Sequence, residues 1–220
     1  MALPRYVSAI VFDCDGLLLD TESCWSRAEE ALFADYGFGF GPAEKDILIG
    51  RTLESACANM AVHFGIPGAG PRLQADLMPR VEAELSAGVA PMPGARQLLE
   101  NLHDRVPIAV ATNSPRAMLT AALKSSALGD FFAISVAADE VARAKPHPEL
   151  YLTAFERLGA SPHTGVAFED SSTGVTAARA ASAFVVTVPS QLGKSLDGDY
   201  ITGTLDDVAL IEWAKTVQKM

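Results

Sequence analysis

The chain has 220 residues, of which 49% are hydrophobic and 20% charged, a composition typical of a soluble globular protein. Its net charge of −10 leaves no basic excess to meet phosphate groups, which argues against nucleic acid or an anionic membrane as a partner. Three cysteines without metal-ligand spacing, and no apolar run of about 20 residues, predict a cytoplasmic protein without a membrane span.

The first predicted element is a buried strand that ends in two acids. Residues 7–12 show almost no polar alternation, which is typical of a strand covered on both faces in a parallel sheet. Because side chains alternate along a strand, Asp13 and Asp15 should point the same way, and Gly16 permits a sharp turn after them. Two neighbouring carboxylates are costly without a cation, and a hard metal such as Mg²⁺ is the simplest one. The alternative, a solvated acidic turn, fits a lone aspartate better than a pair.

The segment that follows carries only helical patterns. Apolar residues at helical spacing predict helices near residues 25–36, 53–64 and 71–87. Gly37 and Gly65 would end the first two, and Thr52 would cap the second. Prolines and a glycine in residues 89–94 then mark a boundary. We therefore expect a helical cap domain, residues 21–88, inserted into a core made of residues 1–20 and 89–220.

Beyond this boundary helices and strands alternate. Helices are predicted at residues 95–104, 115–128, 148–158, 173–181 and 205–217, and strands at residues 108–111, 132–136, 166–168 and 184–188. Such alternation indicates βαβ units and a parallel sheet with helices on both faces. The predicted fold class is α/β, with a Rossmann-like, doubly wound parallel sheet as the core.

Polar residues follow the predicted strands at the ends where an open parallel sheet binds ligands. These residues are Asp13 and Asp15; Thr112, Asn113 and Ser114; Lys145; and Glu169 and Asp170. Each group alone has an ordinary explanation as a helix cap, a solvated lysine or an acidic N-cap cluster. Together they fit phosphoryl transfer. The carboxylates would bind Mg²⁺, and the hydroxyls, N–H groups and lysine would bind an anion. In such a reaction one carboxylate can act as the nucleophile.

Four motifs of the chain resemble those of the haloacid dehalogenase superfamily of phosphohydrolases, in the branch with a helical cap between the first two core motifs. They are DCDGLLLDTE (residues 13–22), ATNS (111–114), AKPHPELY (144–151) and FEDSSTGVTAA (168–178). The motifs occur in the family's order, and the resemblance covers essentially the whole chain.

The resemblance implies a Mg²⁺ site and an acid–base pair. Asp13 would be the nucleophile and a metal ligand. Asp15 would protonate the leaving oxygen, then activate water, and its backbone carbonyl would bind the metal. Asp170 would be a further metal ligand, and Glu169 would support the metal from behind these ligands.

The resemblance also implies an anion site. Thr112 and the backbone N–H of Asn113 would hold the phosphoryl oxygens, next to Ser114. Lys145 would offset the charge of the aspartyl-phosphate.

Two residues of the helical insert are candidates for substrate contacts. Arg51 lies in a Gly-Arg-Thr turn before a helix, from which it could reach a phosphate, although an ordinary surface arginine is the alternative. Similar caps in the family carry a substrate-contacting arginine in a comparable turn. Glu22, where the first cap helix would meet the core, is the second candidate. The insert would act as a lid with hinges at residues 20–22 and 89–94.

The expected substrate is a small phosphorylated metabolite, a sugar or polyol phosphate in the first place, taken by a monomer. β-Phosphoglucomutases of this branch typically carry a histidine where this chain has Trp25, so we expect net hydrolysis, with Trp25 packed in the cap. A β-phosphoglucomutase-like phosphosugar mutase is the alternative within the family. A non-catalytic binder or regulator of phosphorylated ligands on the same fold is the alternative from another class.

One position departs from the family pattern. Family members usually end the helix after the fourth motif with glycine, where this chain has Ser182. If this position requires a positive φ, Ser182 is mildly strained.

Overall fold

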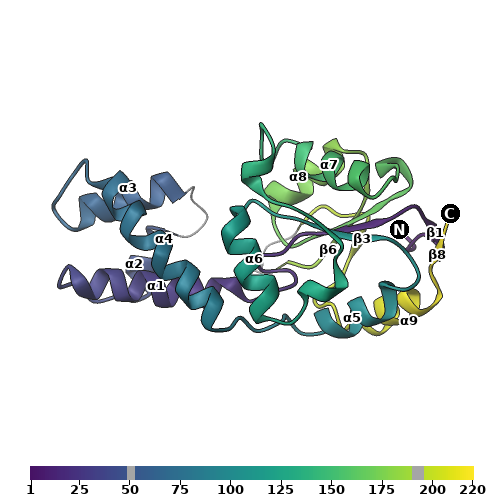
Figure 1. Ribbon diagram of the computed structural model, residues 1–220, viewed down its shortest axis with the longest axis horizontal. Coiled ribbons are helices and arrows are strands. Elements are labelled where there is room, and N and C mark those ends of the chain that lie inside the picture. Colours follow the sequence, from purple (N-terminus) through teal and green to yellow (C-terminus); the bar gives the residue numbers. More distant parts are fainter. Residues whose placement is uncertain (49–52, 190–195) are drawn as a thin grey trace. The chain divides into compact units, whose positions relative to one another are not determined.

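The computed structural model describes residues 1–48, 53–189 and 196–220 (Figure 1). The chain divides into two compact units, one formed by Met1–Asp20 with Ala90–Met220 and the other by Thr21–Val89. The first unit is α/β, and the elements of the second are helices throughout its described residues. The predicted fold class, an α/β core with an inserted helical domain, is confirmed. No helix within the described ranges has both the length and the apolar character to cross a membrane.

A six-stranded parallel sheet forms the centre of the α/β unit, in the order β4-β3-β2-β5-β6-β7. The strands are β2 (Ile10–Phe12), β3 (Ile108–Ala111), β4 (Ile134–Val136), β5 (Val166–Glu169), β6 (Phe184–Thr187) and β7 (Tyr200–Ile201). The sheet extends in both directions from β2, which is the first of its six strands in the chain and lies between β3 and β5. The carboxyl ends of β2, β3 and β5 therefore meet at the point where the strand order reverses, the place where such sheets bind ligands.

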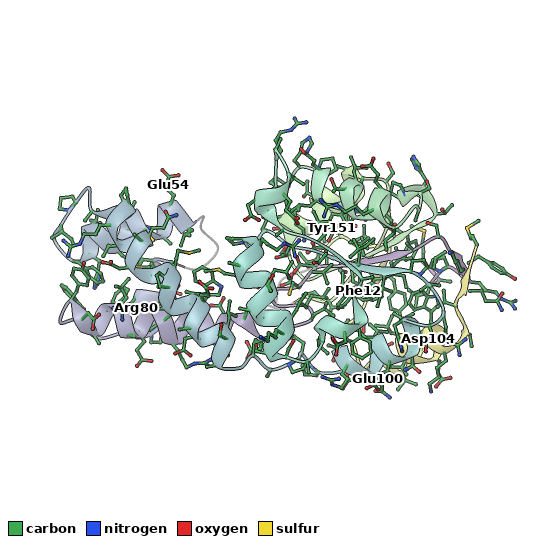
Figure 2. The ribbon with its side chains drawn as sticks, in the orientation of Figure 1. Phe12, Glu54, Arg80, Glu100, Asp104 and Tyr151 are labelled. Atoms are coloured by element: carbon green, nitrogen blue, oxygen red, sulfur yellow. The ribbon has the colours of Figure 1, made fainter. Side chains whose placement is uncertain are left out.

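Helices cover both faces of this sheet. They are α5 (Ala95–Leu102), α6 (Arg116–Ser125), α7 (Glu149–Arg157), α8 (Ser172–Ala180) and α9 (Val208–Thr216), with short 3-10 turns η1 (Gly129–Phe131), η2 (Ala138–Glu140) and η3 (Pro162–Thr164). Figure 1 shows α7 and α8 over one face and α5 and α9 over the other. Val11 and Ala167 pack toward α7 and α8. The next residues along the two strands are Phe12 and Phe168, whose rings stack with their centres 4.8 Å apart. The ring centre of Phe168 lies 6.2 Å from that of Trp213 in α9. Alternate side chains thus serve opposite layers, as strands buried on both faces require; Figure 2 shows Phe12 inside the unit.

The helical unit contains α1 (Thr21–Asp35), α2 (Pro42–Asp46), α3 (Leu53–His63) and α4 (Gly70–Ala87). Helix α4 packs against α1 and α3. It buries leucine and valine at a spacing of four residues, Leu73, Leu77, Val81 and Leu85, which is one face of a helix. Helix α2 was not predicted, because its five residues are too few to show a period. Its start is instead fixed by Glu44, whose carboxylate accepts the N–H of Gly41 at 2.9 Å.

The predicted strand over residues 7–12 is wrong as a single element. It is split into β1 (Tyr6–Val7) and β2, and β1 pairs with β8 (Gln218–Lys219) in a separate two-stranded sheet. The break follows from Ser8, which donates its N–H to Thr164 O at 2.9 Å and its hydroxyl to Ser161 O at 2.8 Å. These hydrogen bonds go to η3 and to Ser161 just before it, so the backbone leaves the ladder at Ser8.

Two other predictions need correction. Trp25, which we expected to be packed in the cap, is only half-buried, whereas Cys24, Ala28, Leu32 and Phe33 are among the buried positions of α1. Tyr36 lies beyond the end of α1, and its ring stacks on that of Phe64 with the ring centres 4.7 Å apart.

Residues 49–52, which include the predicted cap Thr52, lie outside the described residues. Ser182 has a φ of 66°, so the conformation suspected from the sequence is confirmed.

Candidate active site

The two aspartates after β2 lie at the predicted end of the sheet but make different contacts. Asp13 is 7% exposed and donates its backbone N–H to Phe168 O of β5 at 3.0 Å, which continues the ladder by one residue. Gly16, with a φ of 81°, then turns the chain. The N–H groups of Leu18 and Leu19 both donate to Cys14 O at 3.0 Å, so the loop that carries Asp15 is tied back on itself.

Lys145 joins Asp13 to Glu169. Its ammonium group donates to Asp13 Oδ1, and to Glu169 Oε1 at 2.6 Å, while its side chain is only 3% exposed. Burial raises the pKa of Asp13 well above its usual value, and Lys145 opposes that shift. Burial by itself would lower the pKa of Lys145, but the two carboxylates outweigh it and raise that pKa. The structure therefore holds a charged ammonium directly against the candidate nucleophile.

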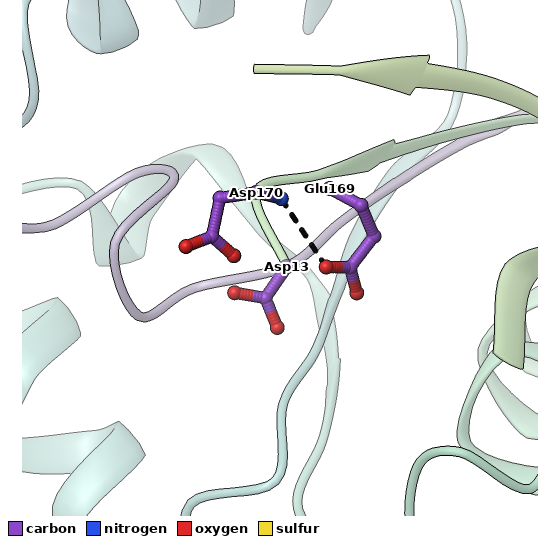
Figure 3. A group of neighbouring side chains, drawn as sticks. All are labelled: Asp13, Glu169 and Asp170. Carbon is purple, nitrogen blue, oxygen red and sulfur yellow. Dashed lines mark hydrogen bonds between the residues drawn. The ribbon is translucent and has the colours of Figure 1, made fainter. Parts of the chain in front are cut away.

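Asp13, Glu169 and Asp170 form a group of carboxylates that fits a metal ion. One oxygen from each lies within 4.8 Å of the others, and Figure 3 shows the three side chains around one space. Carboxylate oxygens are the ligands that Mg²⁺ prefers. Burial raises the pKa of Asp13 first of all, and the nearby charges of Glu169 and Asp170 raise it further, so a divalent cation would relieve both costs. The Asp15 side chain is not part of this group, and its predicted metal contact through the backbone carbonyl stays a prediction.

Thr112 and Ser114 both point their hydroxyls at Asp15. Thr112 Oγ1 donates to Asp15 Oδ2 at 2.6 Å, and Ser114 Oγ donates to the same oxygen at 2.8 Å. The N–H of Ser114 in turn donates to Thr112 Oγ1 at 3.0 Å. The residues after β3 therefore fix the orientation of the Asp15 carboxylate, whereas the sequence had predicted that these hydroxyls bind an anion.

Asn113 has a different partner. Its side-chain amide donates to Lys145 O at 3.1 Å and accepts the N–H of Lys145 at 2.9 Å. This pair of hydrogen bonds fixes the backbone of Lys145 from the neighbouring loop. The side chain of Asn113 is thus used for structure, and the predicted phosphoryl contact concerns its backbone N–H alone.

Comparisons with known proteins show the family to which the chain belongs. The family model described as haloacid dehalogenase-like hydrolase matches residues 10–188. The chain belongs to this family. Among its relatives is the protein CbbY of Rhodobacter capsulatus, 33% identical over 218 residues that cover 94% of this chain and 92% of the relative. Another is hexitol phosphatase B of Escherichia coli K12, 32% identical over 200 residues, covering 86% and 87% of the two chains.

A solved structure extends the likeness to three dimensions. The HAD family hydrolase of Deinococcus radiodurans R1, solved with bound phosphate and sodium, is 26% identical, with a TM-score of 0.70 over 99% of this chain and 92% of that one. This similarity supports the α/β core with a helical insert across the whole length of this haloacid dehalogenase-like chain.

Two residues of the site were missed at the sequence level. Tyr151 of α7 donates its hydroxyl to Glu169 Oε1 at 2.5 Å. Gly174 of α8 leaves the space that the Glu169 carboxyl group occupies, since a Cβ built there would lie 1.9 Å from Glu169 Cδ. Both residues stand inside the quoted motifs. A tyrosine among the apolar positions of a predicted buried helix was the available signal.

Glu22 and Arg51 of the helical unit were the predicted substrate contacts. Glu22 forms an ion pair with Lys45 at 2.6 Å, and Lys45 also pairs with buried Glu29 at 2.7 Å. Lys45 was not singled out from the sequence. The predicted substrate contact Arg51 lies outside the described residues.

Proposed function

We propose that this chain is a Mg²⁺-dependent phosphomonoesterase that hydrolyses a small sugar or polyol phosphate through an aspartyl-phosphate on Asp13. The observation that carries the proposal is the buried pair of Asp13 and Lys145 beside the carboxylates of Glu169 and Asp170. A nucleophilic carboxylate held against an ammonium group suits the transfer of a group that is itself negatively charged. The phosphatase name of the Escherichia coli relative supports a polyol phosphate as substrate class.

In the first step Asp13 attacks phosphorus, so that a bond from its carboxylate oxygen to phosphorus forms while the ester P–O bond breaks. Lys145 offsets the charge that gathers on Asp13 and the phosphoryl oxygens. Asp15 gives its proton to the leaving oxygen as a general acid. Because Thr112 and Ser114 both donate to Oδ2 of Asp15, this proton would be carried on Oδ1.

In the second step the same groups release phosphate. Asp15, now a carboxylate, takes a proton from water as the water oxygen attacks phosphorus, and the bond to Asp13 breaks. The backbone N–H of Asn113 would donate to a phosphoryl oxygen throughout. The hydroxyl of Thr112 would do the same only if it turned away from Asp15, which it bonds at 2.6 Å.

The proposed metal ligands are Asp13, Asp170 and the backbone carbonyl of Asp15, with Glu169 beside them. A bound Mg²⁺ would supply Lewis-acid stabilisation of the charge on the transferring group. The chain's own residues provide the hard oxygen donors for it, and Lys145 and Tyr151 both donate to Oε1 of Glu169.

The test is phosphate release by the purified chain from p-nitrophenyl phosphate and a panel of sugar and polyol phosphates. We expect turnover with Mg²⁺, loss of turnover with EDTA and its return when excess Mg²⁺ is added. Asp13→Asn should abolish turnover, whereas Asp130→Asn, at an exposed aspartate of η1, should leave it unchanged. Full activity of Asp13→Asn would disprove the mechanism.

The same assay separates the alternatives. A phosphosugar mutase would convert a hexose phosphate to its isomer, depend on a sugar bisphosphate and release no free phosphate. A non-catalytic binder would turn over nothing on the panel while still binding a phosphorylated ligand. The three cysteines are buried free thiols, which supports the proposed cytoplasmic location.

A further inference from the structure

Glu169 Oε1 is shared by two donors that come from different elements. Lys145, in the loop after η2, donates to it at 2.6 Å, and Tyr151, in the first turn of α7, donates to it at 2.5 Å. The other oxygen, Oε2, accepts the N–H of Asp170 and the hydroxyl of Ser171, each at the longer distance of 3.2 Å. The carboxylate of Glu169 therefore has four donors, and the two shorter hydrogen bonds both fall on the oxygen that faces Lys145.

Tyr151 is oriented toward this site although it lies in the core. It is fully buried, and Figure 2 shows it within the α/β unit. Its ring packs in the apolar layer with α8, and the Lys145 ammonium lies 4.9 Å from the ring centre. Phenylalanine would satisfy the packing and the contact with the ammonium equally well. What only tyrosine adds is the hydroxyl, whose one partner among the described contacts is Glu169.

The hydroxyl matters because Lys145 is divided between two acids. Its ammonium group donates to Asp13 as well as to Glu169. The position of the ammonium between them depends on the negative charge on Asp13 Oδ1 and on Glu169 Oε1. A second donor on Glu169 Oε1 disperses the charge of that oxygen and fixes the direction of the carboxylate. Without it, Glu169 would attract the ammonium more strongly, or rotate, and in both cases the contact with Asp13 would weaken.

We propose that Tyr151 is a positioning residue that acts through Glu169 to keep the Lys145 ammonium on the nucleophile Asp13. This inference rests on the proposed phosphatase function, because it assigns Tyr151 to the transition state of that reaction. The hydroxyl of Tyr151 donates to Glu169, so it would act on the reaction through that residue. Removal of its hydroxyl should therefore lower kcat with little change in KM.

The experiment compares Tyr151→Phe with a matched control, Tyr200→Phe. Tyr200 of β7 also bonds a carboxylate, Asp207 at 3.4 Å, but belongs to the far edge of the sheet. We expect Tyr151→Phe to lower kcat by about 10- to 100-fold, as the loss of supporting partners of site ligands does elsewhere, and Tyr200→Phe to have no effect. Assays at about 15 °C, near the usual temperature of maximum stability, keep a destabilised variant folded.

A double mutant distinguishes positioning of Lys145 from general damage. In a Lys145→Met background, the further change Tyr151→Phe should alter the residual kcat by less than about twofold, because the residue through which Tyr151 acts is gone. A crystal structure of Tyr151→Phe should show the Lys145 ammonium farther from Asp13.

The inference and the proposed function fail in different ways. Tyr151 does not position Lys145 if Tyr151→Phe keeps the kcat of an active wild-type chain, or if it lowers kcat equally in the wild-type and Lys145→Met backgrounds. The proposed phosphatase function would remain in either case. An unmoved ammonium in the crystal structure would overturn the inference as well. If the wild-type chain turns over no phosphate ester, both are wrong.

Discussion

Replacing Gly174 by alanine tests whether Glu169 is held in one position by its surroundings. Gly174 is the third residue of α8 and has an ordinary helical backbone, so alanine there should favour the helix by about 0.5–1 kcal/mol. The added Cβ would, however, lie 1.9 Å from Glu169 Cδ and Oε1 and 2.0 Å from Oε2. Ordinary carbon contacts are roughly 3.5–4.0 Å, so the carboxyl group would have to retreat by about 1.5 Å or more.

Such a shift breaks the buried contacts of Glu169 with Lys145 and Tyr151. Separation of a buried ion pair costs about 3–5 kcal/mol, which exceeds the gain in helix propensity. We therefore expect Gly174→Ala to lower the free energy of unfolding in urea by about 3 kcal/mol and phosphate release by at least ~100-fold. Gly203→Ala is the control, because nothing lies within 4 Å of a Cβ there, and its stability should stay within about 1 kcal/mol of wild type. A Gly174→Ala variant as stable and as active as the wild type would refute the reasoning.

Two further changes test features outside the carboxylate group. Ser182→Gly should raise the free energy of unfolding by about 0.4–1 kcal/mol, because Ser182 has a φ of 66°; an unchanged or lower melting temperature would contradict this. Lys45→Met should destabilise the chain by about 2 kcal/mol at pH 8, because it leaves Glu29 buried without its cation, whereas Lys215→Met, in an exposed pair with Glu212, should cost less than about 0.5 kcal/mol. Burial raises the pKa of Glu29 and Lys45 opposes this shift, so removal of Lys45 should raise the pKa of Glu29 further. Below that raised pKa Glu29 is protonated in the folded chain and no longer needs a cation. The loss of stability caused by Lys45→Met should therefore be smaller at pH 5 than at pH 8. A loss independent of pH would point to packing instead.

The sequence by itself determined the layers and the edge of the sheet where the polar residues gather. Apolar runs without alternation mark strands buried on both faces, as β2, β3 and β5 are. Because parallel strands end at one edge, acids and hydroxyls placed directly after each run had to come together there. These are local patterns with a simple consequence in space. Very short elements escaped the same logic, since two residues, as in β7 and β8, carry no period.

Only the tertiary structure decided which donor each carboxylate receives. Asp15 and Ser114 are 99 residues apart, and Asn113 and Lys145 are 32 apart, yet each pair is joined by side-chain hydrogen bonds. The sequence could place Thr112, Asn113 and Ser114 near the site but could not say that two of them hold Asp15 and one holds Lys145. Partner choice depends on distances of tenths of an ångström and on rotamers fixed by packing, and neither is written in the spacing of residues along the chain. Tyr151 and Gly174 show the same limit, because a hydroxyl and an absent side chain acquire meaning only when α7 and α8 bring them to Glu169.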